Sequence, residues 1–248
     1  SHASFDLILQ ADIDSTLGTH IDRYDPVSRV YLGSFPVISS PLGLGAMAAS
    51  RQRQELYLRG SQNTVRVYNY STGDYLRSFT LLGTQLAVSD DGNTLYSTTG
   101  SGGLFYADPT TGTVNGMNLS GSTQITALAL GADGRILVYD ATSTTFRSYS
   151  SFGQLLATSP AQGAFANLTE RVAPGASNRT FYAVKTLGSN MITGVTDNLT
   201  NLTEVATSTS YTRVNSLVEA HAGMWLIGES SVSPGVLRYS RMDMNGFI

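Results

Sequence analysis

One stretch of the chain, residues 55–80, constrains the fold more than any other. It reads ELYLRGSQNTVRVYNYSTGDYLRSFT and divides into three short segments, ELYLRG, TVRVYNY and DYLRSFT, separated by turn sequences SQN and STG. Apolar and polar residues alternate within each segment, which is the period-two pattern of a half-buried β-strand. A fourth segment, LGLGAMAAS, lies just before them. The stretch therefore predicts four consecutive strands.

The same four-part arrangement recurs along the chain. A central residue, usually tyrosine, marks the third strand of each repeat, and successive markers differ in number by 44, 38, 43, 46 and 44: Tyr24, Tyr68, Tyr106, Tyr149, Val195 and Tyr239. A period of roughly 40–45 residues with four strands per repeat is typical of a β-propeller. Asp-Gly pairs at 91–92 and 133–134 predict tight turns between first and second strands.

These patterns predict an all-β fold, a six-bladed β-propeller whose blades are four-stranded and antiparallel, in a single domain spanning residues 1–248. The predicted units are approximately 1–38, 39–81, 82–120, 121–161, 162–208 and 209–248.

The first and last predicted units are incomplete. Unit one has no segment for an innermost strand, and unit six stops where its outermost strand would begin. The terminal blade is therefore predicted to be incompletely closed, with an edge that would accept another strand. Either the natural chain continues past its last residue or another chain supplies the missing strand. The predicted partner-binding residues at this edge are Phe5, Leu7, Phe247 and Ile248.

Composition narrows the class of protein. A net charge of -3 and a pI near 5.5 argue against a nucleic-acid partner, because the protein surfaces that bind nucleic acids are basic. Only 13% of the residues are charged, and Lys185 is the only lysine. The chain has no cysteine, and no apolar run is long enough to span a membrane. This composition favours an extracellular or cell-surface location. Asn-x-Ser/Thr sequons, such as the one at Asn69, leave glycosylation open.

The sequence predicts no catalytic site, and it leans against an enzyme. Neither a histidine metal motif nor a G-x-S-x-G nucleophile elbow occurs. The candidates for an acid–base pair are Glu219 and His221, which share one face of the strand predicted to line the channel of unit six. A lactonase or lyase that uses this pair stays open as an alternative.

The sequence also predicts no dedicated metal site and no cofactor. Four carboxylates fall on the predicted turns between second and third strands, and together they would be the candidates for holding Ca²⁺: Asp12, Asp14, Asp140 and Glu229. None lies in a dense D-x-D-x-D-G ladder, which a dedicated calcium loop requires. Solvated loop acids are the simpler interpretation.

The stretches SDDGNTLYSTTG and LFYADPTTGTVNG in unit three resemble the β-propeller repeat of the YVTN and NHL types. The resemblance is best in units two to four and looser over the rest of the chain. It implies a propeller fold, and it is shared by surface-layer proteins, secreted bacterial proteins, lactonases and lyases. Because the recurring tyrosines occupy equivalent strand positions, we interpret them as a packing layer between blades and not as a sugar-binding site.

The sequence thus predicts an extracellular or cell-surface propeller that acts as a non-catalytic binding or assembly module. Its partner would be a protein or a second copy of the chain, bound through loops or the open terminal blade. Two alternatives stay open. One is a structural subunit of a surface layer or fibre, assembled by strand complementation, and the other is the lactonase- or lyase-type enzyme.

Overall fold

The computed structural model describes the side chains of residues 20–25, 27–28, 30–37, 47–131, 134–161 and 199. For residues 8–14, 18–19, 172–174, 180–185, 191–196, 202–207, 211–220, 223–230 and 237–242 it describes strand position alone. These described residues contain β-strands and turns but no helix. The predicted all-β fold class is confirmed.

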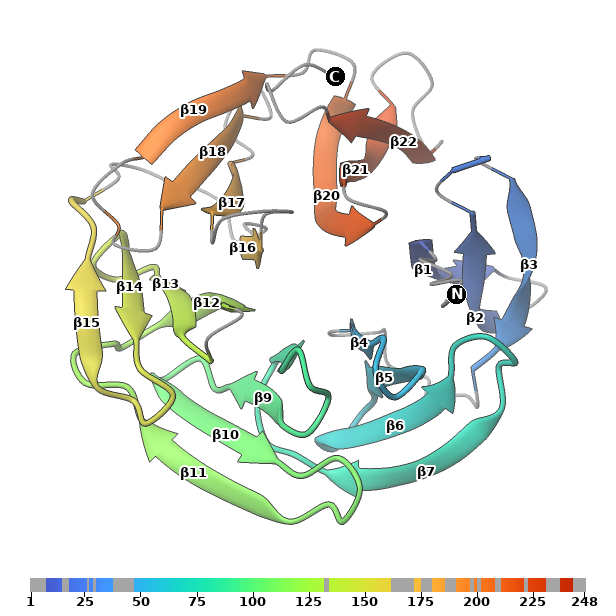
Figure 1. Ribbon diagram of the computed structural model, residues 1–248, viewed down its shortest axis with the longest axis horizontal. Coiled ribbons are helices and arrows are strands. Elements are labelled where there is room, and N and C mark those ends of the chain that lie inside the picture. The colour runs from blue at the N-terminus through green and yellow to red at the C-terminus, as the bar shows by residue number, and fades with distance from the viewer. Residues whose placement is uncertain are drawn as a thin grey trace. The chain divides into compact units, whose positions relative to one another are not determined.

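The first three sheets are antiparallel, and their strands follow one another in chain order. Figure 1 shows the strands of each sheet side by side. The first sheet contains β1 (Ile8–Asp14), β2 (Gly18–Tyr24) and β3 (Tyr31–Pro36). The second contains β4 (Met47–Ser50), β5 (Glu55–Arg59), β6 (Thr64–Asn69) and β7 (Tyr75–Thr80). The third contains β8 (Gln85–Val88), β9 (Leu95–Thr98), β10 (Gly103–Ala107) and β11 (Val114–Asn118).

Three more sheets follow with the same order of strands. The fourth contains β12 (Ile125–Leu130), β13 (Ile136–Asp140), β14 (Thr145–Tyr149) and β15 (Leu155–Thr158). The fifth contains β16 (Val172–Pro174), β17 (Thr180–Lys185), β18 (Met191–Thr196) and β19 (Leu202–Thr207). The sixth contains β20 (Tyr211–Ala220), β21 (Gly223–Ser230) and β22 (Leu237–Met242).

The chain divides into two compact units, residues 1–97 with 105–115, and residues 98–104 with 116–248. Within the first unit, the first strand of the second sheet, β4, contacts the first strand of the third, β8. Within the second unit β12 contacts β16, and β16 contacts β20. Contact between the first strands of successive sheets is the arrangement found at the centre of a propeller. The single domain and the number of six blades stay predictions.

The three-stranded sheets lie where the sequence predicted incomplete units. Tyr24 and the turn after it correspond to Tyr68 and its turn, so β1, β2 and β3 match β5, β6 and β7. The described residues of the first sheet therefore contain no counterpart of β4. In the sixth sheet, they contain no counterpart of an outermost strand. The incompletely closed blade stays a prediction.

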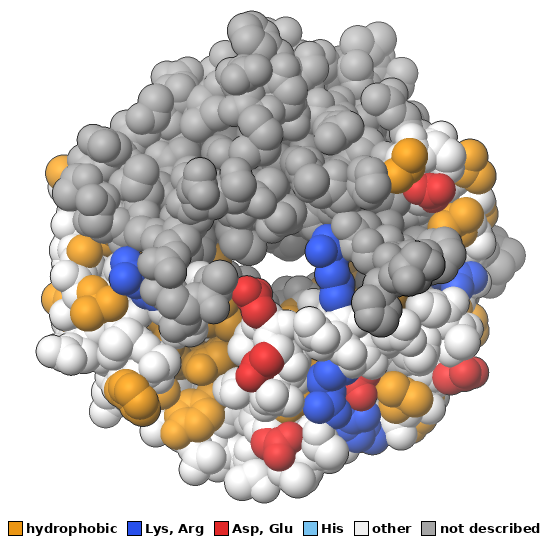
Figure 2. Space-filling model, viewed as in Figure 1, with side chains coloured by type: hydrophobic (Ala, Val, Ile, Leu, Met, Phe, Trp, Pro, Cys, Tyr) orange, Lys and Arg blue, Asp and Glu red, His pale blue; other side chains and the backbone are white. Residues whose placement is uncertain are grey.

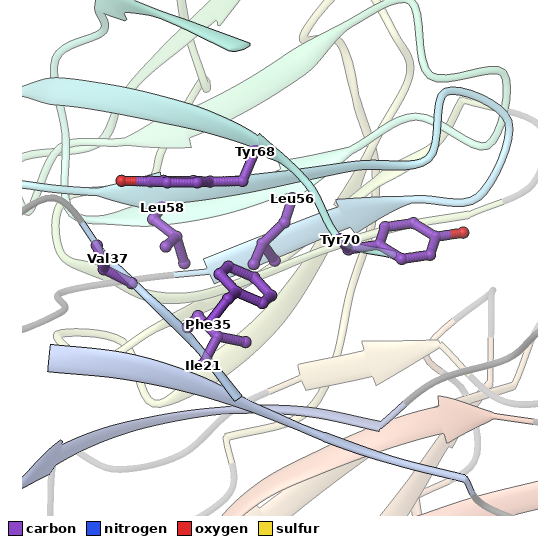
Figure 3. Packing of buried hydrophobic residues seen from close by; sticks show 7 residues of the cluster. All are labelled: Ile21, Phe35, Val37, Leu56, Leu58, Tyr68 and Tyr70. Atoms are coloured by element: carbon purple, nitrogen blue, oxygen red, sulfur yellow. The ribbon is translucent and has the colours of Figure 1, made fainter. Parts of the chain in front are cut away.

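Both faces of the second sheet are covered, so one sequence expectation fails there. All five residues of β5 are buried, although the alternating pattern predicted a half-buried strand. Leu56 and Leu58 pack with Ile21 and Phe35 of the first sheet, and Figure 3 shows the Phe35 ring beside Leu56 and Ile21. Residues of the opposite face, including Tyr57, pack with the third sheet. Stacking of sheet on sheet buries the residues of both faces.

One device builds the turn between the last two strands of the first four sheets. A side-chain oxygen accepts the backbone N–H two residues further on, which is an Asx-type turn. The pairs are Asp25 with Val27 (2.8 Å), Asn69 with Ser71 (2.9 Å), Asp108 with Thr110 (2.7 Å) and Ser150 with Phe152 (3.3 Å). The Asp-Gly turns between first and second strands are confirmed by the positive φ of Gly92 and Gly134, 72° and 76°.

Candidate functional site

The structure places the predicted site residues on strands or outside the described residues. Asp12 and Asp14 lie in β1, where they pair with His20 and Gly18 of β2. Glu219 lies near the end of β20, paired with Met224, and Glu229 lies in β21, paired with Arg213 and Leu237. These four carboxylates were expected on turns, or on a channel-lining strand in the case of Glu219. The remaining predicted residues lie outside the described residues: Phe5, Leu7, His221, Phe247 and Ile248.

Asp140, the other candidate for Ca²⁺, is the last residue of β13 and is fully buried. Its Oδ2 accepts the backbone N–H of Thr123 at 3.0 Å, and its Oδ1 accepts that of Thr142 at 3.0 Å. Arg147 Nη1 lies 3.9 Å from Oδ2. These internal donors give the carboxylate a role in the turn. In the described part of the chain, no three His, Cys, Asp or Glu residues lie close enough to hold a metal ion.

A histidine–carboxylate pair that sequence reasoning missed lies in β2. His20 Nε2 is 3.5 Å from Asp22 Oδ1, and the Tyr31 hydroxyl donates to the same oxygen at 3.4 Å. His20 and Asp22 are 8% and 9% exposed. Such burial leaves little access for a substrate, which favours a structural role. Their i, i+2 spacing on one strand was the signal available in the sequence.

Among the side chains that the structure describes, the carboxylate with the most hydrogen bonds and ion pairs is that of Glu55, which lies buried at the start of β5. Arg77 donates from Nη1 to Oε1 at 2.9 Å and from Nη2 to Oε2 at 2.7 Å, a bidentate ion pair. Arg53 Nε and the Tyr57 hydroxyl also donate to Oε2, at 3.0 and 2.8 Å. We call Arg53, Glu55, Tyr57 and Arg77 the Glu55 cluster.

Hydrogen bonds control the protonation state of this cluster. Burial raises the pKa of Glu55, but the hydrogen bonds from Arg77, Arg53 and Tyr57 outweigh it and hold the pKa below its usual value. Burial, followed by the hydrogen bond to Glu55, raises the pKa of Tyr57. The hydrogen bond to Glu55 raises the pKa of Arg53 against the effect of burial. The cluster thus contains a carboxylate and two cations at neutral pH, and it does not resemble a catalytic acid poised near neutrality.

The two arginines of the cluster reach from the second sheet to the turn after β10. Arg53 Nη2 donates to Thr110 Oγ1 at 2.7 Å, and Arg77 Nε donates to the Pro109 carbonyl at 2.8 Å. Arg23 makes a similar contact from the first sheet to the Ser71 carbonyl of the second. Arginine side chains therefore tie the turns of successive sheets together within the first unit.

A second arginine contact lies deeper between these sheets. Arg59 is 5% exposed and donates to the Leu81 carbonyl at 2.7 Å and to Ser97 Oγ at 2.6 Å. Its Nε has no hydrogen-bond partner. Burial lowers the pKa of Arg59 to about 10, so the side chain stays charged at neutral pH. Its partners are a carbonyl and a hydroxyl, which points to a structural role.

Beside the third turn of the third sheet lies a groove of about 410 Å³. It is formed within the first unit and is lined by Asn93, Thr94, Tyr106, Asp108, Thr111, Thr113 and Asn115. The Tyr106 ring lies 6.0 Å from that of Tyr96. The backbone N–H of Thr110, followed by other hydrogen bonds in the turn, lowers the pKa of Asp108 below its usual value. We call this set of lining residues the polar groove.

Tyr106 corrects one interpretation drawn from the sequence. The turn-forming residues Asn69 and Asp108 are equivalent, so the counterpart of Tyr68 is Ala107 and not Tyr106. Ala107 is buried, as are Tyr68 and Tyr149, whereas Tyr106 lies one position earlier and is half-buried. A shift of one residue turns a strand side chain to the opposite face. Tyr106 is therefore not part of the predicted tyrosine layer.

The outermost strands form another exposed surface. Each of β3, β7, β11 and β15 lies at the edge of its sheet, and Arg77 is the only charged residue in them. Three of these strands begin with two apolar residues that are 41–53% exposed: Tyr31 and Leu32, Tyr75 and Leu76, Leu155 and Leu156. We call these the outer-edge pairs. On the described part of the face in Figure 2, acidic and basic side chains lie among many uncharged polar groups.

The comparisons support the fold. A chain in the crystal structure of the mitotic checkpoint complex superimposes with a TM-score of 0.62, and the match covers 96% of this chain and 71% of that one at 12% sequence identity. This neighbour is propeller-like, so the sheets described above belong to a propeller-like fold; at this identity the likeness concerns the fold alone. No protein-family model and no curated protein sequence matches the chain. Among the described residues no helix is long and apolar enough to cross a membrane.

Proposed function

We propose that this protein is a non-catalytic binding module, at the cell surface or outside the cell, that recognises extended segments of partner proteins. The observation that carries the proposal is the low charge and the exposed apolar residues of the outermost strands that contain the outer-edge pairs. Proteins normally protect exposed edge strands with lysine or other charges, because an unpaired edge accepts a further strand. Here the backbone supplies hydrogen-bonding groups and the outer-edge pairs supply apolar contacts.

The described carboxylates favour binding over catalysis. Glu55 is committed to two arginines, Asp140 caps backbone N–H groups, and Asp108 shapes a turn. The hydrogen bonds to Glu55 and Asp108 hold the pKa of each of these two carboxyls below its usual value, so neither is a catalytic acid poised near neutral pH. A lactonase or lyase, the competing proposal, would depend on Glu219 and His221. Loss of a measured turnover in Glu219→Gln, with unchanged folding, would establish that class instead.

The proposed location is supported by composition and by the repeat type. Only 13% of the residues are charged, and the repeats resemble those of secreted and surface propellers of the YVTN and NHL types. Brief protease treatment of intact source cells should degrade the protein while a cytosolic marker survives. If the protease degrades the protein only after the cells are lysed, the proposed location is wrong, but the proposed binding mode is not contradicted.

The alternative assembly proposal is a subunit of a surface layer or fibre, in which a second copy completes the open terminal blade predicted from the sequence. The outer-edge pairs are a further set of edges to which a second copy could add a strand. Light scattering at increasing concentration separates the two. A protein that stays monomeric favours a different partner, whereas growth to large species that Leu76→Lys suppresses favours self-assembly.

The binding proposal is tested by charging the edge. We would immobilise the wild-type protein and the double variant Leu76→Lys, Leu156→Lys, and capture partners from a surface extract of the source cells. The matched control, Gln52→Lys with Thr142→Lys, adds the same charge at exposed turn positions. The proposal expects a discrete partner that the control retains and the edge variant loses by about tenfold or more in affinity. Equal retention by all three proteins would refute it.

A further inference from the structure

The polar groove becomes informative when the second and third sheets are compared. Residues 55–80 align with residues 94–119 without a gap. The turn hydrogen bonds confirm the alignment: the bond from Gly60 to Thr64 corresponds to that from Thr99 to Gly103, and the bond from Asn69 to Asp74 corresponds to that from Asp108 to Thr113. The two sheets are therefore two versions of one repeat, and differences between them are local changes of side chain.

The positions that close the second sheet are open in the third. Glu55 and Arg77 form the bidentate ion pair of the Glu55 cluster, and their counterparts are Thr94 and Gly116. Neither replacement can form an ion pair, and each has a smaller side chain than the residue it replaces. Val67, fully buried in the second sheet, is replaced by the half-buried Tyr106. Thr94 and Tyr106 line the groove, and their counterparts in the second sheet, Glu55 and Val67, are buried.

The groove offers one aromatic surface surrounded by neutral polar groups. Tyr106 contributes a ring, with Tyr96 behind it at 6.0 Å. Asn93 and Asn115 contribute amides, and three threonines contribute hydroxyls: Thr94, Thr111 and Thr113. Amides and hydroxyls both donate and accept hydrogen bonds. No lysine or arginine is among the described residues that line the groove, so nothing there selects an anionic ligand.

Asp108 adds a strong acceptor. The backbone N–H groups of Thr110 and Thr111 both donate to its Oδ1, at 2.7 and 3.4 Å, and the side chains of these threonines also hydrogen-bond to the carboxylate. Asp108 is exposed, and a carboxylate has about four acceptor positions, so it can also accept a hydrogen bond from a ligand hydroxyl. Asn69, the counterpart of Asp108, forms the same turn with an amide oxygen. The turn therefore does not require a carboxylate at this place.

We propose that the polar groove is a binding site for a neutral, hydroxyl-rich ligand, namely a short saccharide. The apolar face of a sugar ring would stack on Tyr106, since aromatic rings present a large apolar surface. Adjacent hydroxyls would exchange hydrogen bonds with the amides, the threonines and the exposed carboxylate of Asp108. The groove volume of about 410 Å³ lies within the range of small-ligand sites, roughly 300–1,000 Å³. This site is separate from the outer-edge pairs, so it does not depend on the proposed protein binding.

The test uses substitutions that the repeat itself shows to be compatible with the fold. Tyr106→Val copies Val67, and Asp108→Asn copies Asn69. Tyr75→Val is the matched control, because it removes an exposed tyrosine outside the groove and copies its own counterpart, Val114. Binding of a panel of neutral oligosaccharides, made of glucose, mannose, galactose or N-acetylglucosamine units, would be measured by isothermal titration calorimetry and saturation-transfer NMR. Circular dichroism and thermal unfolding would establish that each variant is folded.

The proposal expects at least one oligosaccharide to bind at millimolar concentration or better. Its affinity should fall about tenfold or more in Tyr106→Val, fall measurably in Asp108→Asn, and stay unchanged in Tyr75→Val. Saturation transfer should be strongest for the ring protons of the sugar face that stacks on Tyr106. If no member of the panel binds, or if folded Tyr106→Val and Asp108→Asn bind as well as the wild type, the proposal is wrong.

Discussion

Glu55 combines more interactions than any other single residue described above. Its two oxygens receive hydrogen bonds from Arg53, Tyr57 and Arg77, and the arginines continue to the next turn. Because the carboxylate is buried, removing any of these hydrogen-bond donors would destabilise the folded protein. The cluster therefore couples the second sheet to the turn after β10 through one side chain.

Substituting Glu55 should destabilise the protein in a pH-dependent way. We expect Glu55→Gln to lower the free energy of unfolding at neutral pH by about 2–3 kcal/mol, because two half-buried arginines lose their buried anion. The folded-state pKa of Glu55 lies below its usual value of 4.5, so its stabilisation is present above about pH 4.5 and is lost as the pH falls through the folded pKa. Urea unfolding between about pH 7 and pH 3 measures both effects.

The difference in the free energy of unfolding between the wild type and Glu55→Gln should therefore shrink towards the acid end of that range. Asp74→Asn is the control, since Asp74 lies in an exposed turn, where its hydrogen bond comes from Thr72. A difference between wild type and Glu55→Gln that is the same at every pH would contradict the assignment of an ionised, stabilising Glu55.

Tyr149 is the clearest member of the tyrosine layer in the second unit. It is fully buried, its hydroxyl lies 2.7 Å from Ser122 Oγ, and it donates to the Ser120 carbonyl at 3.0 Å. Tyr149→Phe should cost about 1–2 kcal/mol, because the ring stays packed and only the hydrogen bonds are lost. Tyr149→Ala should cost about 3–5 kcal/mol through the cavity it creates. Denaturant unfolding distinguishes the two, and equal costs would mean that packing contributes nothing beyond the hydroxyl.

The positions and contacts of individual side chains were harder to predict from the sequence than the strands or the fold. The tyrosine layer was predicted, but Tyr106 was assigned to it because an alignment on tyrosine alone overlooks the turn-forming residue. The Glu55 cluster was missed because its members are brought together by pairing and stacking of strands, and charge spacing along the chain gives no sign of it. Asp108 and Asn69 are both turn-forming residue types, so aligning the repeats on these two positions would have paired Tyr68 with Ala107 instead of Tyr106.

At the scale of elements, the turn between the last two strands of a sheet carries much of the packing. Gly73 in the second sheet has a φ of 82° and donates its N–H to the Asn69 carbonyl at 2.8 Å. A Cβ at this position would lie 2.6 Å from Phe35 Cβ, which is part of a rigid core residue in the first sheet. Glycine is thus required both by its backbone conformation and by the close approach of a neighbouring sheet.

This double requirement gives a matched pair of substitutions. Gly134→Ala should cost about 1 kcal/mol, because its φ is 76° but the nearest atom to a new Cβ is 3.6 Å away. Gly73→Ala should cost about 2–4 kcal/mol, because a steric clash with Phe35 adds to the same backbone strain. Chemical denaturation of the two variants checks the order. Equal losses would show that backbone conformation alone explains the glycine at position 73.

Elements were predicted better than residues because the period-two pattern and the turn residues are local. Strands β4 to β7 lie within the four segments expected for unit two, and β8 to β15 fall four to a unit within the predicted units 82–120 and 121–161. The predicted Asp-Gly turns have the expected conformation. The full burial of β5 was not predicted, since it depends on a sheet against each of its faces. The expected turn positions of Asp140 and Glu229 also differ from the structure, where both residues belong to strands.

At the scale of the whole molecule, the repeat period predicted a propeller-like fold that the structural neighbour supports. Function could not be predicted at the same level, because the repeat positions that define the fold are different from the surface positions that bind partners. The described surface combines low charge with apolar residues on its outermost strands, including a Phe152 that is 90% exposed at a turn. These features are the basis of the proposed binding function.

Photo-crosslinking in the source cells tests that function most directly. A photoreactive phenylalanine analogue would replace Leu76 and, in separate variants, Leu156 and the turn residue Gln52. We predict discrete crosslinked products with the same partner from positions 76 and 156, and none from position 52, because only the outer-edge pairs are proposed to contact it. Products that appear only at position 52, or at no position in cells that contain the folded protein, would contradict the account.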